Sequence, residues 1–260
     1  MKPTIEEFLQ NPKAITLMGM SGVGKTRLSA MLAKHGWHHY SCDYLIGTKY
    51  MSDALADDAK NISKKNIRNL STFIGKVGDP SKGGIELKEY KRRQKLYYDA
   101  ECQSLRDVAA AMRETPGTDF VNDSTGSLCE ILDQDVVAEV GRVTLFVYIK
   151  ASPQEELKVL DRAQRSPKPM FFPPDRFDEW LADYMENKNI DDPDKIDPDE
   201  FSRWIFPRLF EARLPKYQRL ADLYGVTIPS EDLRAVHDDR QFIDCVAKTL
   251  KDPAVHWHVG

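Results

Sequence analysis

The sequence lacks the features of membrane-spanning, secreted and strongly basic proteins. No apolar run approaches the roughly 20 residues that cross a bilayer, and the N-terminus has neither the basic nor the apolar block of a signal peptide. Lys and Arg number 37 and Asp and Glu number 41, which gives a net charge of −4 with the charges spread along the chain. These absences predict a cytoplasmic protein with no membrane partner, and they argue against a dedicated nucleic-acid partner.

Cysteine is scarce and widely spaced. The four cysteines form no C-x-x-C pair and have no histidine at zinc-site spacing; they are Cys42, Cys102, Cys129 and Cys245. We therefore expect reduced thiols, some of them buried, and no structural metal.

A phosphate-binding loop is present. Residues 19–26 read Gly-Met-Ser-Gly-Val-Gly-Lys-Thr, a complete G-x-x-x-x-G-K-[ST] motif between the apolar run 14–18 and a helical pattern. In that setting the backbone N–H groups and the helix N-terminus bind phosphate, Lys25 reaches the β- and γ-phosphates, and the Thr26 hydroxyl ligates Mg²⁺. The motif predicts ATP and Mg²⁺ as cofactors, held by Gly19, Ser21, Gly22, Val23, Gly24, Lys25 and Thr26.

Strand and helix patterns alternate along the chain. Short apolar runs predict strands at 14–18, 37–41, 119–123, 143–149 and 226–228, and apolar periodicity predicts helices that include 201–224 and 238–250. This alternation predicts an α/β fold, a P-loop three-layer sandwich whose five-stranded parallel sheet is covered by helices on both faces. We expect a single domain over residues 1–260, as a monomer or a homodimer.

Two segments extend this plan. Residues 45–96 are polar and predict an insertion with short, exposed helices. Residues 162–205 are rich in proline and aspartate and predict an enlarged lid, in which Phe177, Trp180 and Tyr184 require burial. The sequence indicates no specific role for the insertion or for the terminal His256 and His258.

Several motifs, in their order, resemble the shikimate-kinase-like branch of the nucleoside-monophosphate-kinase group of P-loop proteins. Asp43 closes the second strand 18 residues after Lys25, and Val121–Ser127 resembles the strand and substrate loop of that family. Arg162 with Lys168-Pro169-Met170 resembles the lid, and Arg213-Leu214-Pro215-Lys216-Tyr217 matches an R-x-P-x-Y signature. With the phosphate-binding loop, these motifs span roughly residues 14–230.

The resemblance implies an ATP- and Mg²⁺-dependent kinase that phosphorylates a hydroxyl of a small molecule. It implies catalytic roles for Lys25, Asp43 and Arg162 and substrate binding by Asp43, Gly126 and Arg213. Three departures from the family predict a hydroxylated acceptor that differs from shikimate and is larger. Tyr98 replaces the carboxylate-binding arginine, Ser41 replaces the first aspartate of a D-x-D pair, and the substrate loop keeps one glycine of three.

Each candidate also has a structural interpretation. Asp43 is either the base that orients the acceptor or the N-cap of a helix that starts at Tyr44. Asp123 either holds Mg²⁺ through water or caps the turn at 124–126. Arg162 and Arg165 are placed as lid arginines would be, but arginines late in a helix also favour its dipole end, so only one of the two is expected to be catalytic. We expect Arg162 to be the catalytic one and Arg165 to bind the nucleotide. Arg213 either clamps an anionic group or is a surface charge, and His38 and His39 are expected to be packing or edge residues.

Two other functions fit the same motif. One is a nucleoside, nucleotide or toxin-like sugar-nucleotide kinase on the same fold. The other is a nucleotide-dependent switch or ATPase with a protein or nucleic-acid partner, which predicts slow hydrolysis stimulated by a macromolecule and little dependence on Asp43.

Overall fold

The computed structural model describes residues 3–56, 67–173 and 175–251, and the chain divides into two compact units. We call the first the sheet unit; it comprises Met1–Asp43, Cys102–Glu155 and Leu214–Gly260. We call the second the helical unit; it comprises Tyr44–Glu101 and Glu156–Arg213. The segments predicted as an insertion (45–96) and a lid (162–205) both fall within the helical unit.

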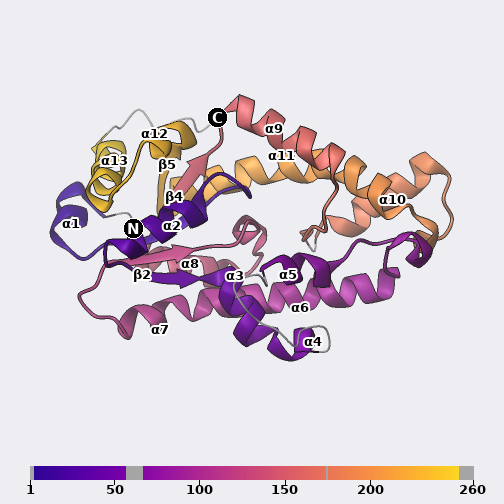
Figure 1. Ribbon diagram of the computed structural model, residues 1–260, viewed down its shortest axis with the longest axis horizontal. Coiled ribbons are helices and arrows are strands. Elements are labelled where there is room, and N and C mark those ends of the chain that lie inside the picture. The colour runs from indigo at the N-terminus through magenta and orange to yellow at the C-terminus, as the bar shows by residue number, and fades with distance from the viewer. Residues whose placement is uncertain (1–2, 57–66, 174, 252–260) are drawn as a thin grey trace. The chain divides into compact units, whose positions relative to one another are not determined.

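The sheet unit is built on five parallel strands in the order β2-β3-β1-β4-β5. Figure 1 labels β2, β4 and β5 among them. The strands are β1 Ala14–Met18, β2 His38–Ser41, β3 Phe120–Asp123, β4 Leu145–Lys150 and β5 Gly225–Pro229. All four neighbouring pairs are parallel, so the carboxyl ends of the strands lie at one edge of the sheet. The predicted five-stranded parallel α/β sheet is confirmed.

Side chains along β1 and β4 alternate between the two faces of the sheet, and each face packs against a layer of helices. On one face, Ile15, Leu17 and Val147 pack in a largely aliphatic core with Leu28 of α2 (Lys25–Lys34) and Phe242 of α13 (Asp239–Lys251). On the other face, the aromatic ring of Phe146 packs on Tyr224 and that of Tyr148 on Tyr217, at centroid distances of 5.5 and 5.3 Å. Both tyrosines belong to the end of α11 (Pro198–Tyr224), so the sheet unit is a three-layer α/β arrangement.

The helices that lie wholly in the sheet unit are α1 Ile5–Gln10, α2 Lys25–Lys34, α7 Val108–Arg113, α8 Gln134–Val143, α12 Ser230–Arg234 and α13 Asp239–Lys251. Four further helices run from one unit into the other: α3 Cys42–Leu45, α6 Leu87–Arg106, α9 Pro153–Arg165 and α11 Pro198–Tyr224. None of the helices in the described ranges is long and apolar enough to cross a membrane. The four cysteines are free thiols, and three of them are buried, as expected.

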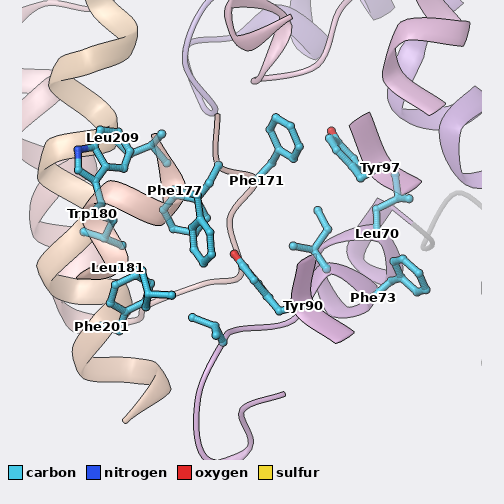
Figure 2. Packing of buried hydrophobic residues seen from close by; sticks show 14 of the residues in the cluster. Leu70, Phe73, Tyr90, Tyr97, Phe171, Phe177, Trp180, Leu181, Phe201 and Leu209 are labelled. Atoms are coloured by element: carbon cyan, nitrogen blue, oxygen red, sulfur yellow. The ribbon is translucent and has the colours of Figure 1, made fainter. Parts of the chain in front are cut away.

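The helical unit contains the larger parts of α6, α9 and α11 and half of α3. It also contains η1 Ile46–Tyr50, α4 Ser52–Ala56, α5 Ile67–Ile74 and α10 Phe177–Lys188. Its core is rich in aromatic side chains from segments far apart in the sequence (Figure 2). Phe177, Trp180 and Tyr184 are buried in this core, which confirms the burial expected for them.

The expectation of exposed helices within 45–96 is wrong. Ile46, Met51, Leu70 and Phe73 are each at most 6% exposed and belong to the aromatic core. The same core includes Phe171, Trp180 and Phe201, which lie about 100 residues or more further along the chain. The polar composition of the segment concealed these few apolar positions, because their burial depends on contacts with distant residues. His256 and His258 lie outside the described residues.

Candidate functional site

The phosphate-binding loop has the backbone that its glycines predict. It leaves β1 at Met18 and enters α2 at Lys25, and Gly19, Gly22 and Gly24 have φ angles of 142°, 95° and 107°. At Gly19 a side chain is also excluded by space, because a Cβ atom would lie 2.8 Å from the carbonyl oxygen of Ile149 in β4. The strand, loop and helix that a phosphate cradle requires are therefore all in place.

Lys25 and Thr26 occupy the first turn of α2. Lys25 is only 8% exposed, and its Nζ atom donates to the carbonyl oxygens of Gly19 (2.6 Å) and Met20 (3.3 Å). The ammonium group thus lies within the loop, where its charge adds to that of the helix N-terminus. Thr26 is exposed beside it, and its hydroxyl sits in the first turn of the helix.

Asp123 lies at the carboxyl end of β3 and is 6% exposed. Its Oδ2 atom accepts a hydrogen bond from the Ser29 hydroxyl (3.1 Å), and Ser29 also donates to the carbonyl oxygen of Thr26 (3.2 Å). Ser29 therefore joins Asp123 to the helix turn that carries Thr26. The contact connects Asp123 to the helix turn predicted to ligate Mg²⁺, and the metal role of Asp123 stays a prediction.

His39 was expected to be only a packing or edge residue. It does lie on β2 at the sheet edge, but its Nε2 atom is 3.9 Å from Oδ2 of Asp123. Sequence reasoning gave no role to this contact or to Ser29. The position of Ser29, one helix turn after Thr26, was the available signal; the approach of His39 depends on how β2 pairs with β3 and has no local signal.

Asp43 lies in the first turn of α3, directly after the carboxyl end of β2. The helix begins at Cys42, so the interpretation of Asp43 as the N-cap of a helix starting at Tyr44 is wrong. Burial raises the pKa of Asp43 from 3.8 to about 6, the positive charge of Lys25 opposes the rise, and the negative charge of Asp123 adds to it. Asp43 is thus electrostatically coupled to both the phosphate-binding loop and Asp123.

The loop from Ser124 to Ser127 lies beside the phosphate-binding loop. The Ser124 hydroxyl donates to the carbonyl oxygen of Leu17 in β1 (2.7 Å). A Cβ atom at Gly126 would lie 3.8 Å from the backbone nitrogen of Ser21. Gly126, the residue predicted to bind substrate, is therefore adjacent to the loop predicted to bind phosphate.

Two residues that follow Arg213 fix this loop in place. The Tyr217 hydroxyl donates to the carbonyl oxygen of Gly126 (2.6 Å), and Lys216 forms an ion pair with the fully buried Glu130. The R-x-P-x-Y pattern drew attention to these positions, but the sequence assigned a role only to Arg213. The partners Gly126 and Glu130 are more than 80 positions away, so spacing could not reveal them.

The three candidate arginines all belong to the helical unit. Arg162 and Arg165 are exposed near the end of α9, and Arg165 forms an ion pair with Asp161. Arg213 is half-buried and donates to the carbonyl oxygen of Phe171 (2.9 Å). Their contact with nucleotide or acceptor stays a prediction, while Arg213 has a structural contact that a solvated surface charge would lack.

Three observations indicate that the site in the sheet unit could hold a magnesium nucleotide. Three glycines adopt left-handed backbone angles, and the buried Lys25 lies in the loop. The Thr26 hydroxyl lies in the helix turn that Ser29 joins to the Asp123 carboxylate by a hydrogen bond. Within the described ranges no three His, Cys, Asp or Glu side chains gather as a metal cluster. A magnesium ion here would take few protein ligands and keep several waters, as it does beside phosphates.

The sequence matches no protein-family model and no curated protein. Among solved structures, it is similar to the 1.7 Å crystal structure of shikimate kinase from Bacteroides thetaiotaomicron. The two chains are 14% identical; the match covers 92% of this chain and 96% of that one, with a TM-score of 0.40. We assign the fold from the strand order and the loop geometry described above.

Proposed function

We propose that this protein is a kinase that uses ATP and Mg²⁺ to phosphorylate a hydroxyl group of a small molecule. The observation that carries the proposal is the position of Asp43. A carboxylate with a pKa of about 6 is electrostatically coupled to the lysine of a phosphate-binding loop. A phosphate-binding loop alone serves many nucleotide-binding proteins, whereas a base beside it is what a hydroxyl acceptor requires.

The loop residues have distinct roles in this proposal. The backbone N–H groups from Ser21 to Thr26 would hold the phosphates of ATP, and Lys25 would neutralise charge on the β- and γ-phosphates. The Thr26 hydroxyl and, through water, Asp123 would hold Mg²⁺. The bound ion would supply charge neutralisation and alignment of the phosphates.

Asp43 would act on the acceptor. At pH 7 a carboxyl group with a pKa of about 6 is mostly ionised and can accept a proton. Asp43 would accept the proton of the acceptor hydroxyl while that oxygen forms a bond to the γ-phosphorus and the bond to the bridging oxygen breaks. The products are the phosphorylated acceptor and ADP, and Gly126 would border the acceptor because it adjoins the phosphate-binding loop.

The acceptor is expected to differ from shikimate in the group that the enzyme recognises. The Tyr98 ring, which stands in place of a carboxylate-binding arginine, stacks on Phe171 at 6.3 Å with an interplanar angle of 17°. A phenol packed in this way does not supply the bidentate cation that recognises a carboxylate. We propose a hydroxylated acceptor whose anionic group, if it has one, meets Arg213, with Arg162 and Arg165 as candidates for contacting the nucleotide phosphates.

The test is to incubate the protein with MgATP and a pooled metabolite extract and to identify phosphorylated products by mass spectrometry. We expect one class of metabolite to gain a phosphate. Lys25→Ala should reduce the rate by about 10²- to 10³-fold and Asp43→Asn by about 10²- to 10⁴-fold. Lys34→Ala, which removes an exposed lysine from the other end of α2, is the matched control and should retain the activity.

If wild-type protein binds ATP tightly but phosphorylates no metabolite, the kinase proposal is wrong. ATP hydrolysis that is accelerated by a protein or nucleic acid, and that survives Asp43→Asn, would instead identify the switch or ATPase.

A further inference from the structure

A chain of buried polar side chains crosses the sheet unit from α3 to the start of β4. Cys42 donates to Oδ1 of Asn122 (3.2 Å), and Nδ2 of Asn122 donates to Oγ1 of Thr16 (3.2 Å). The hydroxyls of Thr16 and Thr144 are 2.7 Å apart, and the Thr144 hydroxyl donates to the carbonyl oxygen of Val140 (3.0 Å). Cys42, Asn122 and Thr16 are completely buried.

The hydrogen bonds of this chain all run in one direction. Because the Thr144 hydroxyl gives its proton to Val140, Thr16 must be the donor in the bond between the two threonines. Each side chain from Cys42 to Thr144 thus donates to the next, and the last bond ends on a backbone carbonyl. Aligned hydrogen bonds polarise one another, and in a dry interior the loss of one member leaves another polar group unpaired. The chain therefore fixes its members in one arrangement.

The first member of the chain precedes Asp43. Helix α3 has only four residues and continues directly into the five residues of η1, and so short a helical segment is not stable by itself in water. Cys42 ties the first turn to Asn122, which is paired in register with Tyr40 of β2. Within the described residues no hydrogen bond or ion pair of its own fixes the Asp43 carboxylate, so the backbone of α3 sets its position.

We propose that the buried chain Cys42–Asn122–Thr16–Thr144 is a positioning device that holds Asp43 in place beside the phosphate-binding loop, with Asn122 as its central residue. The charged groups that act on Asp43 are Lys25 from α2 and Asp123 from β3, and Asp123 in turn contacts His39. Both act on Asp43 over a distance, and within the described residues neither forms a hydrogen bond or an ion pair with its carboxylate. The catalytic consequence rests on the proposed function, whereas the structural consequence does not.

The structural consequence is tested by alkylation of Cys42 with iodoacetamide, followed by mass spectrometry of each cysteine-containing peptide. Asn122→Ala breaks both central bonds, and we expect it to accelerate labelling of Cys42 at least tenfold. Thr144→Val, at the far end, should have a smaller effect in the same direction and serves if Asn122→Ala does not fold. Cys102 and Cys129, which are buried in the same unit, are internal controls, and the half-buried Cys245 reports that the reagent is active.

The catalytic consequence is tested with matched substitutions of Cys42. Cys42→Ser keeps a donor to Asn122, whereas Cys42→Ala removes it. We expect Cys42→Ala to lower kcat at least fivefold with unchanged ATP binding, and Cys42→Ser to restore most of the rate.

The outcomes separate the two proposals. Labelling of Cys42 that rises only together with Cys102 and Cys129 would mean general destabilisation and would overturn the positioning role, as would a Cys42→Ala variant with full kcat. If the wild type phosphorylates nothing, the proposed function fails, yet selective exposure of Cys42 in Asn122→Ala would still establish what holds α3.

Discussion

The two units of this protein are stabilised by different kinds of interior. In the sheet unit, strands pack Ile, Leu and Val side chains against α2 and α13, and a chain of polar side chains crosses the sheet. In the helical unit, aromatic rings from α6, α10 and α11 interlock; Tyr184 and Phe201, for example, have ring centroids 5.0 Å apart. The sheet unit also carries the phosphate-binding loop, Asp43 and Asp123, whereas the helical unit carries the three candidate arginines and pairs many of its charges, as Lys76 does with Asp199.

This difference indicates how the units divide their roles. The sheet unit keeps the buried charge of Asp43 close to glycines with left-handed backbone angles, and in the proposed kinase the buried charge costs stability where the reaction requires it. The helical unit depends on a few large side chains for its interior, so truncating one ring should have a large local effect. The predictions below test this division, beginning with the largest expected change.

Removal of a large ring should separate the two interiors most clearly. Trp180 in α10 and Phe242 in α13 are 5% and 0% exposed. Trp180→Ala and Phe242→Ala should each lower the free energy of unfolding of their own unit by about 3–5 kcal/mol, through lost burial and the cavity left behind. Peptide-resolved hydrogen exchange should show faster exchange in α10 and the first half of α11 for Trp180→Ala, and in β4, β5 and α13 for Phe242→Ala.

Nucleotide binding provides a second readout for this pair. Trp180→Ala should keep MgATP affinity within a few-fold, and Phe242→Ala should weaken it. Equal acceleration of exchange in both units by either variant would contradict the division, because it would show that the two interiors unfold together.

Burial of the Asp43 charge should lower the free energy of unfolding, so removing that charge should raise it. The pKa of Asp43 is raised from 3.8 to about 6, so the folded protein holds this proton over a pH range in which the unfolded chain has lost it. Stability is therefore lost as the pH rises from about 4 to about 6 and does not change further above that. Asp43→Asn should raise the free energy of unfolding by at most about 3 kcal/mol at pH 7 and by nothing at pH 3.

Urea unfolding of the wild type and Asp43→Asn between pH 3 and pH 8 measures this difference. Asp199→Asn in the helical unit is the contrasting variant, because it removes a partner of Lys76 and should lower stability by less than about 1 kcal/mol. If Asp43→Asn leaves stability unchanged or lowers it at pH 7, burial of the ionised Asp43 carboxylate does not destabilise the folded protein. In a kinase assay, the same pKa predicts a rate that falls as the pH drops below about 6.

A glycine in each unit tests where backbone strain serves function. Gly19 has a φ of 142° and Gly78 a φ of 132°, and a Cβ atom would lie 2.8 Å from the carbonyl oxygen of Ile149 and 2.3 Å from that of Ile196, respectively. Alanine at either position should lower the free energy of unfolding by about 2 kcal/mol. Only Gly19→Ala should also abolish tight ATP binding, as measured by calorimetry; loss of binding in Gly78→Ala alone would reverse the assignment of roles.

How well the sequence predicted a feature depends on whether that feature is local in the sequence. The phosphate-binding loop and the five strands were predicted because a loop motif and short apolar runs are local features. The burial of Ile46 and Leu70 was missed because their partners, such as Phe171 and Trp180, are distant in the sequence. The bonds from Ser29 to Asp123 and from Tyr217 to Gly126 escaped prediction for a related reason: the residues that meet are fixed by strand order and helix packing, and not by spacing.

The smallest contrast concerns one hydroxyl group in each unit. Tyr217 and Tyr184 are at most 1% exposed and each packs against another aromatic ring. The Tyr217 hydroxyl donates to the carbonyl oxygen of Gly126 (2.6 Å), whereas the buried Tyr184 hydroxyl lies near the Glu200 carboxylate and makes no hydrogen bond of standard geometry among the described residues. Tyr217→Phe should therefore lower the free energy of unfolding by about 1 kcal/mol, because a buried carbonyl loses its donor, while Tyr184→Phe should be neutral or stabilising.

Function should separate this pair further. Without its bond to Tyr217, the loop at Gly126 is free to shift beside the phosphate-binding loop. If that loop borders the acceptor, Tyr217→Phe should raise the KM for the acceptor more than that for ATP, and Tyr184→Phe should change neither. An equal loss of stability in both variants would mean that ring packing, rather than the hydroxyl, determines the effect. An unchanged acceptor KM in Tyr217→Phe would instead remove the Gly126 loop from the acceptor site, even if the hydrogen bond contributes to folding.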